Sequence, residues 1–398
     1  MVAEEAFAFD PFSLEARADP YPAYRQMLED EAMRLYRNNE RGFAAVTRYD
    51  DVVGVLRDWA TYTSARGVEI DESSGEFGEG VFLQEDPPLH KQLRGVVHSD
   101  FSPRAIREQF EGRVKAQADS LLDDLSDSGQ PDFGDQVTWR LPTITISELL
   151  GLPADDLEWL IDVEERFQRR VIGQVTPPDA ATEASHELCD YFSRHLEERR
   201  RRPREGLLSK IANATLDGEP IGEAALGLSL IVFTAATDTT SCLLSNALYH
   251  LEAHPEQREW LCGNLDHIPA AIEEALRFDS PLQVTKRVTA VDSSLAGTDL
   301  PEGTDVYVLY GAANRDQRRF ESPDRFDVRR EAKRNVAFGE GVHHCIGAPL
   351  ARLEARILLE CVLTRMPGYS LGDGATRFES HMMRGFRRLP VDPSSLAA

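Results

Sequence analysis

Hydrophobic and polar positions along this chain recur mainly with the period of an α-helix. Breaks that contain glycine or proline, at 128–131, 151–153 and 176–178, divide the longer helical segments. The pattern predicts helices at residues 22–29, 50–56, 86–94, 103–150, 155–202, 222–253, 269–278 and 349–366.

Strand signals are few and short. Residues 33–46 alternate around Asn38-Asn39 as a hairpin does, and residues 280–287 and 306–309 read as strands. Residues 381–391 predict a second hairpin, with a tip that reaches a binding pocket. The predicted fold class is therefore mainly α with small β-sheets. Residues 60–85 are rich in Gly, Ser and Glu without periodicity, which is typical of a functional lid or a disordered loop.

Residues 222–253 form the most hydrophobic long segment. As one helix they would span roughly 45–50 Å. Polar residues at the centre argue against a membrane span and include Asp238, whose burial without a partner would cost several kcal/mol or raise its pKa. The threonines around it can bond back to the carbonyl four residues earlier, which bends a helix and opens a groove.

Cys345 lies between a glycine-containing loop and a helical run with Pro349 just inside its start. Free N–H groups and the helix dipole favour a thiolate there. Gly339, Gly341 and Gly347 let the backbone approach something flat and bulky, and a soft thiolate suits iron. A buried structural cysteine is the plain alternative. A zinc site made from residues 343–345 fails, because three adjacent residues cannot enclose a tetrahedral metal.

Composition narrows the function classes. The net charge is −24 over 398 residues, which argues against nucleic acid or an anionic membrane as a partner. The first forty residues hold no apolar run of the length of a signal or anchor segment. Five cysteines, mostly in helical apolar contexts, predict a reduced cytoplasmic location.

The string FGEGVHHCIGAPLAR (338–352) fills every position of FxxGxxxCxG and resembles the haem-binding loop of the cytochrome P450 family. AATDTT (235–240) is similar to that family's oxygen-activation motif. The resemblance covers essentially the full length and implies a single haem-thiolate monooxygenase domain over residues 1–398. It also implies the cytochrome P450 fold, with a long central helix over the haem and the cysteine loop before the penultimate helical segment.

The resemblance assigns the cofactor contacts. Cys345 would bind the iron of haem b. His90 and Arg94, at i and i+4 of one helix, would meet one propionate, and Arg287 with His343 the other, because unpaired buried charge is expensive. A solvated helix face is the plain alternative for the first pair. The remaining cofactor-binding residues implied by the motifs are Ala235, Phe338 and Gly347.

The same resemblance assigns catalysis to the acid–alcohol pair Asp238 and Thr239. Thr239 would hydrogen-bond the dioxygen and Asp238 would relay protons from solvent; an ion-paired structural aspartate is the plain alternative. Ala236 stands where glycine is commoner in the family and would narrow the oxygen groove. Glu274, Arg277 and Arg330 match a buried structural ion-pair network, whose disruption would cost about 3–5 kcal/mol.

The implied function is insertion of one oxygen atom from O2 into a small, apolar or aromatic substrate, by hydroxylation or oxidative O-dealkylation. Electrons would come from a separate ferredoxin and reductase, since no nucleotide-binding motif is visible, and the protein would be a soluble bacterial monomer. The alternatives are a peroxide-driven peroxygenase and a gas or ligand sensor or carrier without turnover. Neither of these needs Asp238 and Thr239.

Substrate specificity is the least defined part of the prediction. TSARGVEI (63–70) and RGFRRLPV (384–391) are similar to members that oxidise para-substituted benzoic acids, yet the central helix carries LIVF (230–233) where those members hold a carboxylate. Arg66 is then the only obvious anion anchor. The predicted pocket residues are Arg66, Phe82, Phe167, Val232, Phe233, Ala236, Leu282, Val284, Thr285 and Met383.

Overall fold

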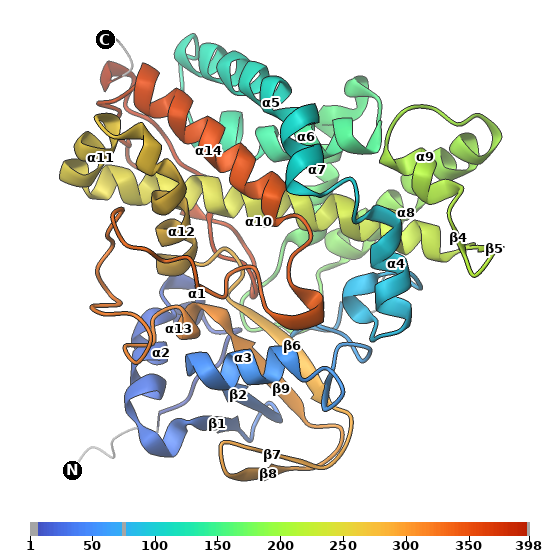
Figure 1. Ribbon diagram of the computed structural model, residues 1–398. Coiled ribbons are helices and arrows are strands. Elements are labelled where there is room, and N and C mark those ends of the chain that lie inside the picture. Colours follow the sequence, from blue (N-terminus) through green and yellow to red (C-terminus); the bar gives the residue numbers. More distant parts are fainter. Residues whose placement is uncertain (1–6, 74–76, 396–398) are drawn as a thin grey trace.

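The computed structural model describes residues 7–73 and 77–395, and shows a helical assembly above a small sheet region (Figure 1). The helices are α1 (Leu14–Ala18), α2 (Tyr21–Glu29), α3 (Tyr49–Arg57), α4 (Leu89–Val97), α5 (Pro103–Ser126), α6 (Arg140–Leu150), α7 (Leu157–Gln168), α8 (Asp179–Arg201), α9 (Leu207–Ala212), α10 (Ala224–Ala253), α11 (Pro255–Cys262), α12 (Ile268–Phe278), α13 (Tyr310–Ala313) and α14 (Ala348–Arg365). The predicted breaks within 103–150 and 155–202 are confirmed by the gaps between α5 and α6 and between α7 and α8.

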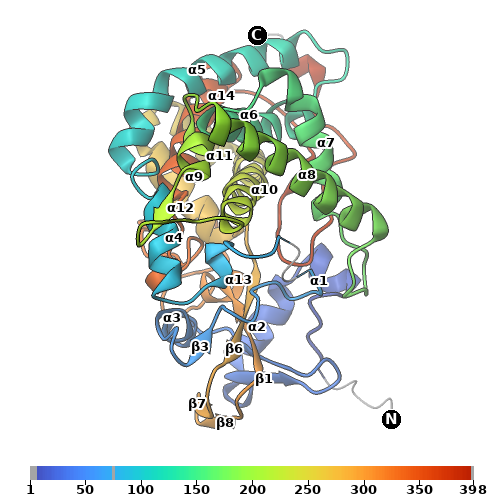
Figure 2. The same cartoon turned by 90° about the vertical axis from the view of Figure 1, so that its right-hand side faces the viewer.

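α10 crosses the molecule and packs against α6, α8, α12 and α14. In Figure 2 it is seen nearly along its axis, with other helices around it. Within the described part of the chain it is the one helix long and apolar enough to cross a membrane, but 72% of its most apolar stretch is buried in protein. A helix that is hydrophobic all round belongs in the core of a large protein.

The polar centre of α10 satisfies its hydroxyl groups locally. The hydroxyls of Thr239 and Ser241 donate to the carbonyls of Ala235 and Thr237, each at 2.8 Å and one turn earlier. The predicted back-bonding is confirmed, and α10 continues through it as one helix of 30 residues.

A five-stranded sheet has the order β1-β2-β9-β6-β3, in which β2 and β9 run parallel and the other neighbours antiparallel. The predicted hairpin at 33–46 is β1 with β2, with Leu35 opposite Val46. The strands are β1 (Leu35–Asn38), β2 (Phe43–Val46), β3 (Tyr62–Thr63), β4 (Thr215–Leu216), β5 (Glu219–Pro220), β6 (Val284–Thr289), β7 (Ser293–Leu295), β8 (Thr298–Leu300), β9 (Asp305–Leu309), β10 (Thr376–Arg377) and β11 (Phe386–Arg388).

Two sequence predictions were wrong in detail. The helix predicted at 86–94 begins only at Leu89, and the Asp86 carboxylate before it accepts hydrogen bonds from the Thr63 hydroxyl and the Ser64 amide. The hairpin expected at 381–391 is wider, because β11 pairs with β10 and the segment between them forms the connection. Met383 in this connection bridges to Leu282, so the segment still reaches the interior.

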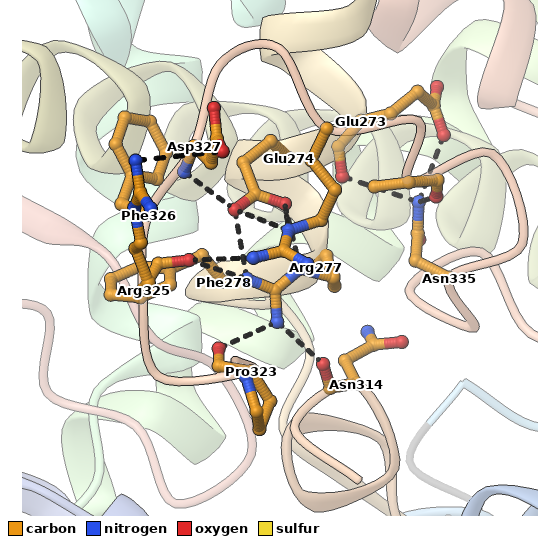
Figure 3. Close-up of polar contacts among 12 residues, drawn as sticks. Glu273, Glu274, Arg277, Phe278, Asn314, Pro323, Arg325, Phe326, Asp327 and Asn335 are labelled. Atoms are coloured by element: carbon orange, nitrogen blue, oxygen red, sulfur yellow. Dashed lines mark hydrogen bonds and ion pairs between the residues drawn. The ribbon is translucent and has the colours of Figure 1, made fainter. Parts of the chain in front are cut away.

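A buried ion-pair network joins α12 to the loop at 321–330 (Figure 3). Arg277 Nε lies 2.7 Å from Glu274 Oε2, and Arg330 Nε donates to Glu274 Oε1 at 3.2 Å. The remaining Arg277 donors reach the carbonyls of Asn314, Pro323 and Arg325. The structure therefore brings together the three residues that the sequence assigned to one network.

Candidate functional site

A cavity of about 260 Å³ lies between the centre of α10 and the loop that carries Cys345. Ala235, Ala236 and Thr239 line it from α10, and Phe338, Cys345 and Gly347 line it from the opposite side. Gly341 has φ +72°, and a Cβ there would lie 2.5 Å from the carbonyl oxygen of Leu56, so glycine is required for the loop to pack on α3. This close approach fixes the loop in front of α14.

Cys345 differs from its sequence prediction in one respect. Burial raises the pKa of its thiol, although the backbone N–H groups of Gly347 and Ala348 and the charge of Arg94 act in the opposite direction. Desolvation therefore outweighs the helix N-terminus, and the expected preference for thiolate is not met by the protein groups alone. A bound metal cation deprotonates a coordinating thiol outright. The thiolate form of Cys345 would therefore depend on a metal ion bound at its sulfur.

Four basic side chains converge at one edge of the cavity. Arg94, Arg287 and His343 line it, while His90 lies behind with its ring centroid 4.4 Å from that of His343. None of the four forms an ion pair within residues 7–73 and 77–395. Burial and the charges of Arg287, His90 and Arg94 lower the pKa of His343 to about 3.

These basic groups also have unused hydrogen-bonding atoms. Both ring nitrogens of His343 and Nε2 of His90 are buried, and no hydrogen-bond partner for them lies in the described part of the chain. Arg94 donates to the carbonyl of His344 at 2.7 Å, and Arg287 to that of Lys286 at 2.8 Å. Buried polar groups normally have partners, so this edge fits a bound group that carries more than one carboxylate.

Comparison with known proteins agrees with this geometry. Residues 180–367 match the family model described as "Cytochrome P450". The chain is 37% identical, over 98% of both chains, to the Mycobacterium tuberculosis protein with the name "Putative cytochrome P450 123". It is 34% identical to cytochrome P450 monooxygenase PikC of Streptomyces venezuelae, over 94% of this chain and 91% of that one. The chain belongs to the cytochrome P450 family.

Solved P450 structures share the architecture. CYP109E1 from Bacillus megaterium in complex with testosterone superposes with a TM-score of 0.86 at 28% identity, covering 95% of this chain and 98% of that chain. A mutant of P450 EryK in complex with erythromycin B gives 0.84 at 32% identity, covering 94% and 97%. The predicted fold is confirmed, and the chain is a P450 monooxygenase that uses haem b and O2. A haem with two propionates fits the thiol and the unpaired basic edge described above.

A second cavity of about 140 Å³ opens beside the first on the far side of Thr239. Its lining combines apolar side chains, such as Phe77 and Ile231, with a group of polar ones. The polar side chains come from the segments at 69–73 and 84, the end of α7 and the C-terminal connection, and we call the space the polar cavity after them: Glu69, Asp71, Ser73, Gln84, Gln168, Arg170, Ser380 and His381. Arg170 Nε lies 2.5 Å from Asp71 Oδ2, and both side chains are buried. Sequence reasoning missed this polar cavity, although its Gln168 and Arg170 directly follow the predicted pocket residue Phe167.

Asp238 is 1% exposed and lines the polar cavity. Among residues 7–73 and 77–395 neither of its oxygens has a hydrogen bond of good geometry, and the side chains beside it are the carboxyl of Glu164 on α7 and the hydroxyl of Thr237. Burial and the like charge of Glu164 raise the pKa of Asp238 well above its ordinary value. The sequence predicted that Asp238 relays protons from solvent, but it did not indicate that a second acid, Glu164, lies beside it.

The predicted substrate residues divide into three groups. Phe82, Val232, Ala236, Leu282 and Thr285 line the larger cavity, and Phe167 and Met383 line the polar one. Phe233 was wrongly placed, because it is fully buried against Phe192 of α8. Val284 lines neither cavity and points into the core around α2.

Arg66 was also wrongly placed as an anion anchor. It lines neither cavity, its side chain is 49% exposed, and its guanidinium pairs with Glu302 at 3.0 Å. The sequence offered no signal for this, because Glu302 is 236 residues away along the chain.

Proposed function

We propose that this P450 takes electrons from a separate ferredoxin and oxidises a small, mostly apolar or aromatic molecule, by hydroxylation or oxidative O-dealkylation, as a cytoplasmic monomer. The observation that carries the proposal is the apolar cavity between Cys345 and Thr239, with the acid Asp238 behind it. A sensor or a peroxide-driven enzyme has no need of that acid and alcohol.

The chain's own side chains would hold the cofactor at defined points. Cys345 would bind the iron, and its thiolate would give the haem the electron density that favours O–O cleavage. His90 and Arg94 take one propionate and Arg287 with His343 the other; the absence of competing ion pairs at these four described residues supports this. Phe338 packs under the guanidinium of Arg352 at 4.4 Å, which holds the loop beside Cys345.

Thr239 and Asp238 would control protons on the opposite side. The Thr239 hydrogen is donated to Ala235, so its oxygen can accept a hydrogen bond from a molecule in the cavity. Asp238 lies in the adjoining polar cavity, where water can supply protons. Ala236 lines the larger cavity together with Thr239, and its methyl group restricts the space there.

The substrate class rests on the lining of the larger cavity. Phe82, Val232 and Leu282 present apolar surface to the larger cavity, and most of its lining is apolar, although Glu69 lines both cavities. The related structures bind testosterone and erythromycin B, and both complexes support an organic substrate. For the electron donor, Arg104, Arg107 and Arg113 are exposed on α5, which packs along α14, and offer a basic docking surface.

Reconstitution with a ferredoxin, its reductase and labelled O2 tests the proposal, after a panel of aromatic acids, phenols and terpenoids has been screened for ligand-induced spectral shifts. We expect labelled oxygen in the product of a ligand that shifts the spectrum. Ligand binding without product under any reductant would favour the sensor, and equal turnover with peroxide alone would favour the peroxygenase.

A further inference from the structure

Glu164 and Asp238 form a buried carboxyl pair between α7 and α10. Their side chains are in contact, and the residues are 2% and 1% exposed. Glu164 Oε1 accepts a weak hydrogen bond from Gln168 at 3.3 Å, and Oε2 has no partner of good geometry within the described part of the chain. The hydroxyl of Thr237 lies beside both carboxyls and favours their ionised forms, against the effect of burial. Two ionised carboxylates in contact inside a protein repel each other strongly, because little water is present to screen their charges. The pair therefore retains one proton.

The cation nearest to this pair is already engaged. Arg170 lies close enough to Asp238 to act on it electrostatically, but its Nε pairs with Asp71 and its Nη1 donates to the carbonyls of Phe167 and Arg169. The other ionisable groups around the pair are the thiol of Cys242, one turn along α10, and His381 beside Arg170. Burial raises the pKa of that thiol and lowers that of the histidine, so both remain neutral.

We propose that Glu164 is a positioning residue that keeps a proton on Asp238 for oxygen activation. The inference rests on the proposed role of Asp238. When Asp238 releases a proton toward Thr239, it takes one back from water in the polar cavity that it lines, and the adjoining carboxyl of Glu164 favours this protonated form of Asp238. An arginine in place of Glu164 would hold Asp238 ionised, whereas a carboxyl keeps it able to donate.

Two substitutions should act in opposite directions. Glu164→Gln removes the like charge and offers an amide donor, so Asp238 ionises at lower pH. Gln168→Met removes the donor that favours ionised Glu164, so the pair keeps its proton to higher pH. Burial raises the pKa of Glu164 as it does that of Asp238, which moves the titration of the pair from the acid range toward neutral pH.

The experiment uses the haem-loaded protein and two readouts. The first is the infrared carbonyl band of a protonated carboxyl, identified by its loss in Asp238→Asn. The second is the pH at which the fraction of electrons recovered in product declines. We expect Glu164→Gln to abolish the band at neutral pH and to move the decline down by at least about one pH unit, and Gln168→Met to move it up. Glu183→Gln, at an exposed position on α8, is the matched control.

The outcomes separate this inference from the one beneath it. If Asp238→Asn leaves coupling unchanged, the role proposed for Asp238 fails. If Asp238→Asn impairs coupling but Glu164→Gln and Gln168→Met keep the carbonyl band and the pH profile of the parent protein, only the role of Glu164 is overturned. If the Glu164→Gln protein does not fold, Gln168→Met decides the question. An upward shift of the pH at which coupling declines would support the role of Glu164, and an unchanged pH would overturn it.

Discussion

Arg277 Nε lies 2.7 Å from Glu274 Oε2, and neither side chain is exposed to solvent. Each is also tied to the chain around residues 314–330, so the pair joins α12 to a segment without regular structure. The free energy of this arrangement depends on both partners being present, because either one alone is an uncompensated buried charge.

Glu274→Gln should therefore destabilise the protein strongly. We expect a loss of about 3–5 kcal/mol in the free energy of unfolding, measured by denaturant titration of the haem-loaded protein. Glu259→Gln, at an exposed position on α11, should change it by less than about 0.5 kcal/mol. Equal stability of the two variants would show that the network is not structural.

Thr239→Ala should separate electron consumption from product formation. Removing the hydroxyl leaves Cys345 and the apolar lining intact, so ligand binding and reductant oxidation should persist while oxygen is diverted to peroxide. The ratio of product to electrons measures this, and Thr239→Ser, which keeps the hydroxyl, should retain most of the coupling. An unchanged ratio in Thr239→Ala would remove Thr239 from its proposed role.

Glu354 gives the fold a pH dependence that is independent of catalysis. It is 1% exposed on α14, and burial raises its pKa to about 8. The folded state therefore binds a proton that the unfolded state releases above about pH 4.3, so its contribution to stability falls as pH rises between those two values. The slope is roughly 1.4 kcal/mol per pH unit.

Glu354→Gln should flatten that part of the stability curve. Unfolding free energies at pH 5 and pH 7 should differ by roughly 3 kcal/mol less in the variant than in the parent protein. Glu360→Gln, on the same helix but partly exposed and paired with Arg356, is the control. Parallel curves for the parent and Glu354→Gln would show that Glu354 is not protonated in the folded state.

Arg66→Ala should leave the affinity for acidic aromatic ligands unchanged, because the side chain pairs with Glu302 outside both cavities. Spectral titration with a benzoic acid derivative measures this. A tenfold or larger loss of affinity would show that Arg66 turns inward to hold a ligand.

The sequence predicted those parts of the site that depend on short spacing. Cys345 with its glycines, the polar centre of α10 and the pair Glu274–Arg277 each lie within a few residues, so the local pattern defines their geometry. On α10 it did not distinguish neighbouring faces: Val232 lines the cavity, whereas Phe233, about 100° further round the helix, packs on Phe192.

Long-range contacts were outside the reach of the pattern. Asp71 and Arg170 meet only because the loop before α4 packs against the end of α7, and Glu164 meets Asp238 only because the fold brings one point of α7 close to α10. Neither pair has a spacing that marks it. For Cys345, the sequence indicated the helix terminus, which lowers the pKa of the thiol, but not the burial, which raises that pKa by more.

The central claim is that the sulfur of Cys345 binds the haem iron as a thiolate. The most direct test is the absorption spectrum of the reduced protein under carbon monoxide. The account predicts a main band far to the red of that of a histidine-ligated haem, and its loss in Cys345→Ala. A band at the position typical of histidine ligation, or a spectrum unaffected by Cys345→Ala, would contradict it.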